Sequence, residues 1–209
     1  MRKNVTRLAV LVLGVSALAA CSGTTEGSPE LGGTSGTGTT SPQEPGGRYT
    51  VQMPLRIDSF LSRPCDLLPG ESLNSLGLDA QDGEAKLPEN DAAARATGPY
   101  CSWAGESVSV SVGVQSENTK RGMGGLDGLY AVYEQGRYEF WEETEVAGYP
   151  AAFSATVDQR AEGRCQLAVG IADDMSFTAN AYIGDNPDAA CQAATELAAG
   201  VIQTLGGDR

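Results

Sequence analysis

The chain has 209 residues, a formal net charge of −13 at pH 7 and no histidine. The missing histidine excludes Ser-His-Asp and Cys-His catalysis, histidine zinc sites and the most common general base. The acidic balance disfavours nucleic acid, whose phosphates it repels, and gives no electrostatic attraction to anionic lipid. No GxxxxGK[ST] or GxGxxG motif occurs, so the sequence offers no phosphate-binding loop of either kind.

Residues 1–20 have the pattern of a lipoprotein signal peptide. A basic start is followed by the apolar run Leu8–Ala20 and then by Cys21. The run is too short to span a hydrocarbon core, which needs about 20 residues. Small residues followed directly by a cysteine form a bacterial lipobox, in which the cysteine is acylated and becomes the first mature residue. The alternative is an ordinary secreted protein in which this cysteine occurs by chance.

Lipidation of Cys21 would hold the protein on the extracytoplasmic face of the cell membrane. At least two acyl chains are enough for stable anchoring, so we expect membrane contact through the lipid anchor only. Residues 21–48 are predicted to be the lipidated cysteine and a flexible tether, because their Gly, Ser, Thr and Pro composition buries too little apolar surface to fold. Residues 49–209 are predicted to form one globular domain.

The first half of this domain mixes weak and strong patterns. A short helix is expected over residues 58–68, and Pro69-Gly70 would end it. Residues 70–98 are weakly patterned, with one turn of helix around Leu73 and Leu76 and a surface loop over 84–98. Strands then begin near Tyr100, and valines alternate with small residues over 108–114, which is typical of a strand with one buried face.

The second half has clearer periodicity. Helical spacing of apolar residues predicts a helix over 124–136, and a second helix follows the Asp185-Asn186-Pro187-Asp188 start and stops at Gly206-Gly207. Between them, four strands are predicted: 142–147, 149–156, 164–172 and 176–183. This order predicts an α+β fold, an antiparallel sheet with helices packed mainly on one face.

Four cysteines remain once Cys21 is acylated: Cys65, Cys101, Cys165 and Cys191. An even number in an exported protein indicates two disulfides, with three connectivities allowed. A thiolate metal site is the alternative, but it lacks the close C-x2-C pairs that such sites use. Sequential pairing encloses the shorter loops and is easier to close during folding. Loop length alone leaves the crossed pairings open.

Four short motifs occur in order behind the lipobox: Pro64-Cys65-Asp66-Leu67-Leu68, Cys101-Ser102-Trp103, Gly148-Tyr149-Pro150-Ala151, and Cys191 opening an Ala-rich helix. Together they resemble the DUF3558 family of actinobacterial lipoproteins over about residues 60–205. The resemblance implies no catalytic residues, because none are established for the family. It favours the pairs Cys65–Cys101 and Cys165–Cys191, since the cysteines fall in the same ordered motifs.

Two sets of residues are candidates for a site. Strand alternation places Glu143 and Glu145 on one face, where a carboxylate pair could bind Ca2+ or act in a glycosidase, although a solvated sheet face is the favoured interpretation. Tyr138, Phe140 and Trp141 lie in a connection before a strand. Core packing is their default role, and lining a ligand groove or a partner surface is the functional alternative.

The sequence therefore predicts no catalytic residue, no metal site and no cofactor. We expect a monomeric, non-enzymatic binding module for an envelope ligand, such as a small apolar molecule, or for an envelope protein. The alternatives are a carboxylate-based extracytoplasmic hydrolase and an assembly factor for an exported complex.

Overall fold

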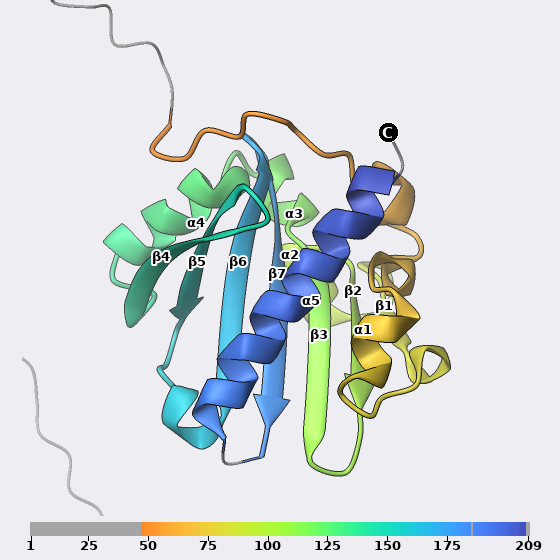
Figure 1. Ribbon diagram of the computed structural model, residues 1–209. Coiled ribbons are helices and arrows are strands. Elements are labelled where there is room, and N and C mark those ends of the chain that lie inside the picture. The colour runs from red at the N-terminus through yellow and green to blue at the C-terminus, as the bar shows by residue number, and fades with distance from the viewer. Residues whose placement is uncertain (1–46, 185, 208–209) are drawn as a thin grey trace, which may run out of the picture. The chain divides into compact units, whose positions relative to one another are not determined.

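The computed structural model describes residues 47–184 and 186–207, which all belong to one compact unit (Figure 1). The expected signal peptide, Cys21 and the tether up to residue 46 lie outside the described residues. None of the helices within the described ranges is long and apolar enough to cross a membrane.

The described residues form an antiparallel sheet of seven strands in the order β1-β2-β3-β7-β6-β5-β4. The pairing of β3 with β7 joins the two parts of the sheet. The strands are β1 (Glu84–Lys86), β2 (Tyr100–Ala104), β3 (Val108–Val114), β4 (Phe140–Val146), β5 (Tyr149–Ala155), β6 (Arg164–Ala172) and β7 (Met175–Ile183).

The sheet is flanked by helices on both faces. The α-helices are α1 (Gly70–Asn74), α2 (Ala92–Thr97), α3 (Ser116–Lys120), α4 (Gly125–Glu134) and α5 (Pro187–Gly207). The single-turn 3-10 helices are η1 (Asp58–Phe60), η2 (Pro64–Leu67), η3 (Ala80–Asp82) and η4 (Arg160–Glu162). The long helix α5 crosses one face diagonally, and α2, α3 and α4 lie behind the sheet in the same view (Figure 1).

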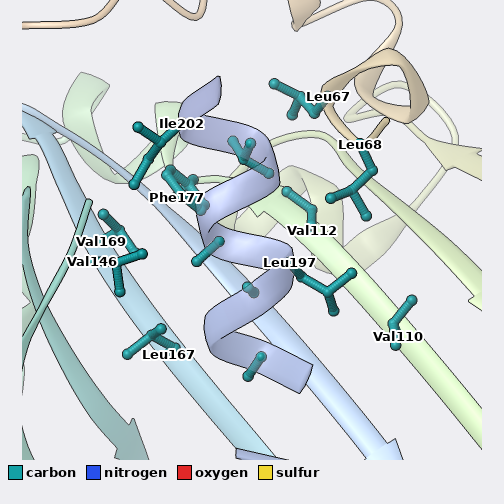
Figure 2. Close-up of a cluster of buried hydrophobic side chains, with 14 of the residues drawn as sticks. Leu67, Leu68, Val110, Val112, Val146, Leu167, Val169, Phe177, Leu197 and Ile202 are labelled. Carbon is teal, nitrogen blue, oxygen red and sulfur yellow. The ribbon is translucent and has the colours of Figure 1, made fainter. Parts of the chain in front are cut away.

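The main core lies between α5 and the sheet. Strand alternation turns Val110 and Val112 of β3 and Leu167 and Val169 of β6 towards α5, where they are buried with Leu197 (Figure 2). Each such side chain contributes about 1.5–3 kcal/mol when it leaves water. The α+β class predicted from the sequence is therefore confirmed, with its longest helix on one face.

The opposite face is covered only in part. Leu126 and Leu129 of α4 pack on Ala168 of β6, and a Cβ at Gly170 would already touch the Leu126 side chain. Helix α3 contacts β7 and α2 in turn contacts α3. The rest of this face carries polar side chains, and it positions the candidate site.

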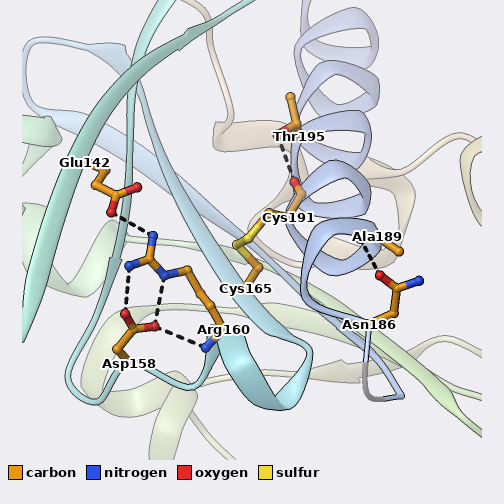
Figure 3. The surroundings of a disulfide bond; sticks show 8 residues. All are labelled: Glu142, Asp158, Arg160, Cys165, Asn186, Ala189, Cys191 and Thr195. Carbon is orange, nitrogen blue, oxygen red and sulfur yellow. Dashed lines mark hydrogen bonds and ion pairs between the residues drawn. A yellow bond between two sulfur atoms is a disulfide. The ribbon is translucent and has the colours of Figure 1, made fainter.

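Both disulfides join elements that are distant in the sequence. Cys65 of η2 pairs with Cys101 of β2, with a Cα–Cα distance of 4.9 Å. Cys165 of β6 pairs with Cys191 of α5, with a Cα–Cα distance of 5.0 Å (Figure 3). These are the two predicted pairs. In the chain-entropy model each bridge stabilises the fold by about 3–4 kcal/mol.

Between residues 58 and 98, two segments differ from the sequence-based expectation. The helix expected over residues 58–68 is two 3-10 turns, because Arg63 has a non-helical backbone just before Pro64. The loop expected over 84–98 contains β1 and α2. Asp91 caps α2 by accepting a hydrogen bond from Ala94 N–H at 2.8 Å. Strand β1 is held by backbone pairing with β2, and backbone pairing requires no apolar pattern in the sequence.

Candidate functional site

A row of polar side chains crosses the sheet on the face opposite α5. The strand register pairs Ser102 with Ser111, Ser111 with Asn180, and Asn180 with Gln166. Residues directly opposite one another in an antiparallel pair point to the same face, so one short polar side chain from each of four strands meets here. The four strands are brought together by the fold and not by proximity in sequence.

A cleft of about 630 Å³ lies over this row. Its far wall comes from residues 155–157, 159 and 160, where β5 has already diverged from β6, and from Phe140. A second hollow of about 250 Å³ adjoins it and shares Ser111, Tyr138, Gln166 and Asn180. The two hollows form one continuous polar surface, which we call the sheet cleft.

The sheet cleft differs from the rest of the chain in charge. The chain carries 27 acidic residues, yet no Asp or Glu lines either hollow. The lining charges are two arginines, Arg160 and Arg164. The other polar lining groups are side-chain amides and hydroxyls, so the cleft is neutral with a basic end.

Much of the hydrogen-bonding capacity in the cleft is unused. Asn180 Nδ2 donates to Ser111 Oγ at 3.3 Å, and Gln115 Nε2 donates to Thr178 Oγ1 at 3.4 Å. Among the described residues, the Gln166 amide and the Tyr138 phenol have no hydrogen-bond partner. An amide offers both donors and an acceptor, so the half-buried Gln166 can bind a group of either kind.

The structure places Tyr138 and Phe140 in the sheet cleft. Tyr138 lines both hollows, and burial raises the pKa of its phenol. Phe140 lies under the Arg160 guanidinium, whose Cζ is 3.9 Å from the ring centroid. Phe140 and Trp141 begin β4 and are not part of the expected connection, because their backbone pairs with β5.

Trp141 does not line the cleft but supports it. Its ring stacks on Tyr138 with centroids 6.3 Å apart, and its indole N–H donates to the Tyr49 hydroxyl at 2.8 Å. Tyr49, Tyr130 and Tyr133 complete an aromatic cluster around it. Trp141 therefore fixes the position of Tyr138 from behind.

Glu143 and Glu145 are exposed on β4 and lie outside the cleft. The Glu143 carboxylate accepts a hydrogen bond from the Tyr49 hydroxyl at 2.5 Å and pairs with Arg48 at 2.7 Å. These two bonds lower the pKa of Glu143. A glycosidase acid needs a raised pKa inside a cleft, and Glu143 has neither. The described residues contain no cluster of acidic or cysteine side chains that could hold a metal ion.

Residues 47–57 form a segment whose bonds to α4 and β6 were not predicted from the sequence, and we call it the strap. Arg48 N–H donates to Asp127 of α4 at 2.8 Å, and Leu55 N–H donates to Ile171 O of β6 at 2.9 Å. Arg48 was expected to belong to the tether, because its neighbours have tether-like composition. Its long-range bonds had no local sequence signal.

The cleft residues of β6 and β7 were also missed, although they left a signal. Gln166 interrupts an apolar strand, and Asn180 and Tyr182 alternate with buried alanines. Polar residues at alternate positions of a central strand indicate that one of its faces is open to solvent.

The comparisons with known proteins give a family and no activity. The family described as "Protein of unknown function (DUF3558)" matches residues 16–204. No curated protein and no solved structure matches the chain. The family match spans nearly the whole sequence, from before Cys21 into the last turn of α5. The chain therefore belongs to the DUF3558 family.

Proposed function

We propose that this protein is a lipid-anchored, extracytoplasmic binding module whose sheet cleft binds a polar ligand rich in hydroxyl or amide groups. The observation that carries the proposal is the lining of the cleft, where amides and hydroxyls with unused hydrogen bonds lie beside aromatic rings and no carboxylate. A saccharide of the cell envelope has the matching chemistry.

The extracytoplasmic part of the proposal rests on the sequence. The family match begins at residue 16 and so includes the small residues before Cys21. The disulfides fit an oxidising compartment. A Cys21→Ser variant tests the anchor: we expect it in the medium, or as an uncleaved precursor, while the parent chain partitions into the detergent phase. Detergent-phase partitioning of the variant would refute lipidation.

The cleft fits a polar ligand better than an apolar one. A volume of about 630 Å³ is typical of small-molecule sites, which span roughly 300–1,000 Å³. An apolar ligand would cover the Gln166 amide without a partner, and burying an unsatisfied amide costs about 1–3 kcal/mol. A sugar hydroxyl would instead satisfy it, and the C–H face of the sugar can pack on Tyr138.

A binding role is favoured over hydrolysis by the same lining. A carboxylate-based hydrolase needs two carboxylates across one cleft, and the sheet cleft has none among its lining residues. The one nearby glutamate with a shifted pKa, Glu143, is held in its charged form by Tyr49 and Arg48.

A titration of the purified full chain with cellobiose and with N,N′-diacetylchitobiose, followed by NMR, tests the ligand class. We expect the side-chain amide signals of Gln166 and Asn180 to shift in a saturable way with at least one probe. Gln166→Leu should weaken binding about tenfold, since it removes the free amide. Gln203→Leu is the matched control, because Gln203 is exposed on α5, on the opposite face.

Absence of saturable shifts at Gln166 and Asn180 with both probes would refute a saccharide site in the cleft. Shifts that spread over the exposed β4 edge instead would favour a protein partner.

A further inference from the structure

The two arginines that line the sheet cleft are in opposite electrostatic situations. Arg160 pairs with Asp158 at 2.7 Å and with Glu142 at 2.8 Å (Figure 3). Its hydrogen bond to Asp158 is the largest cause of its raised pKa. Two carboxylates neutralise the charge of this one guanidinium, so Arg160 is not available to bind an anionic ligand. Its ion pairs instead hold the loop between β5 and η4 in place, with the guanidinium over the Phe140 ring.

Arg164 has no such partner. Within residues 47–184 and 186–207, no carboxylate lies within ion-pair distance of its guanidinium, and its side chain makes no hydrogen bond. Its Cζ lies 4.5 Å from the ring centroid of Tyr182, which also lines the cleft. A planar guanidinium held against an aromatic ring keeps its N–H edge free, which favours bidentate binding of a carboxylate or phosphate.

The position of Arg164 relative to the polar row sets the geometry of a ligand. Arg164 and Gln166 are two residues apart on β6, so they point to the same face about 6–7 Å apart. That separation is about the size of one sugar ring. An anionic group bound by Arg164 would therefore be carried by the sugar ring that contacts Gln166 or by the adjacent ring of the same saccharide.

We propose that the sheet cleft selects saccharides that carry one anionic group, a carboxylate or a phosphate, and that Arg164 is the residue that binds it. This inference rests on the proposed function, because it concerns the ligand of the same cleft. Arg164 is the only lining arginine without an ion pair among the described residues, whereas the charge of Arg160 is already matched by two carboxylates. An anionic ligand supplies the missing partner.

The test compares probes that differ in one anionic group. Cellobiose and cellobiouronic acid differ only in that a hydroxymethyl group is replaced by a carboxylate, and glucose and glucose 6-phosphate form the phosphate pair. We expect the purified full chain to bind at least one anionic probe about five- to tenfold more tightly than its neutral counterpart. This gain is the contribution of one charge-assisted hydrogen-bonded pair, between Arg164 and the anionic group, at a solvent-exposed rim. Calorimetry or NMR titration measures both affinities.

Three variants assign the gain to Arg164. Arg164→Gln should remove the anionic preference and leave the affinity for the neutral probe unchanged, whereas Arg164→Lys should keep part of it. Arg56→Gln is the matched control, because Arg56 is exposed and has no ion pair among the described residues, and it does not line the cleft. Higher salt should reduce only the preference that depends on Arg164.

The outcomes separate the two proposals. Equal binding of neutral and anionic probes with shifts at Gln166 would overturn the role of Arg164 and leave the saccharide cleft standing. A preference that survives Arg164→Gln would also overturn it. No shift at Gln166 with any probe would overturn the proposed function itself. A preference confined to glucose 6-phosphate would support Arg164 and identify phosphate as the anion.

Discussion

The Tyr49 hydroxyl is the best place to test how the strap is held on the domain. It donates to Glu143 at 2.5 Å and accepts from Trp141 Nε1 at 2.8 Å and from Arg48 Nε at 3.2 Å. The change Tyr49→Phe removes all three bonds and leaves the ring, which packs against Tyr130. The free energy of unfolding should therefore fall through lost hydrogen bonds and not through lost packing.

The magnitude follows from the exposure of the partners. A hydrogen bond to a charged group contributes about 1.5–3 kcal/mol when shielded from water, and the Glu143 side chain is 46% exposed, so we assign it about 1 kcal/mol. The half-buried Trp141 N–H loses its acceptor at a cost of up to about 1 kcal/mol. We expect a total loss of about 1–2 kcal/mol, which lowers Tm by roughly 3–6 °C in a domain of this size.

Urea denaturation followed by far-UV circular dichroism measures this loss, with an unchanged m-value. Tyr133→Phe is the control, because Tyr133 lies in the same aromatic cluster and its hydroxyl has no hydrogen bond to a described residue. Equal effects of the two variants, or no loss in Tyr49→Phe, would refute the reasoning.

The pH dependence of the Tyr49→Phe effect has a definite sign. The bonds from Tyr49 and Arg48 lower the pKa of Glu143 in the folded state. Stability from such a carboxylate is present above its unfolded pKa and is lost as pH falls through the lower folded value. The difference between parent and variant should therefore shrink between pH 7 and about pH 3. Burial, with the bond to Glu143, raises the pKa of Tyr49 to about 12, so its hydroxyl stays protonated throughout that range.

Other predictions concern the disulfides, one glycine and metal dependence. Replacing Cys165 and Cys191 together with serine should cost about 3 kcal/mol, since the bridge closes a 26-residue separation; a loss below about 1 kcal/mol in urea denaturation would contradict this. Gly98→Ala should cost about 2 kcal/mol or more, because Gly98 has φ +130° and a Cβ would strike the Val114 carbonyl, whereas Gly77→Ala, with open space, should cost about half of that. EDTA should leave Tm unchanged, and a clear drop would indicate a metal site.

The sequence predicts the elements that have long, regular periodicity. Strand 164–172 has the predicted bounds, and the terminal helix begins within two residues of its Asp-Asn-Pro start, because apolar repeats and cap residues are local signals. The disulfide pairs agree with the order of the family motifs, which the resemblance supplied, because loop length alone left the crossed pairings open. The sheet order could not be predicted, since the pairing of β3 with β7 joins strands that are far apart in the chain.

The site was harder to predict than the fold for the same reason. Tyr138 and Phe140 stand out because aromatic residues are few, and both line the cleft. Ser111 and Gln166 are unremarkable in the sequence and become a site only when the register aligns them with Asn180. The bonds of the strap to α4 and β6 could not be predicted, because they depend entirely on tertiary structure.

The position of the strap determines which end of the sheet receives a force applied through the N-terminal segment. It is bonded to Ile171 at the end of β6, whereas Arg164 begins the same strand, roughly 23 Å away along it. A pull on the N-terminal segment is therefore delivered to one end of the sheet, and the basic rim of the cleft lies at the other. If the chain is anchored through Cys21 and binds a ligand in the cleft, as we propose, the two functions would use opposite ends of the sheet.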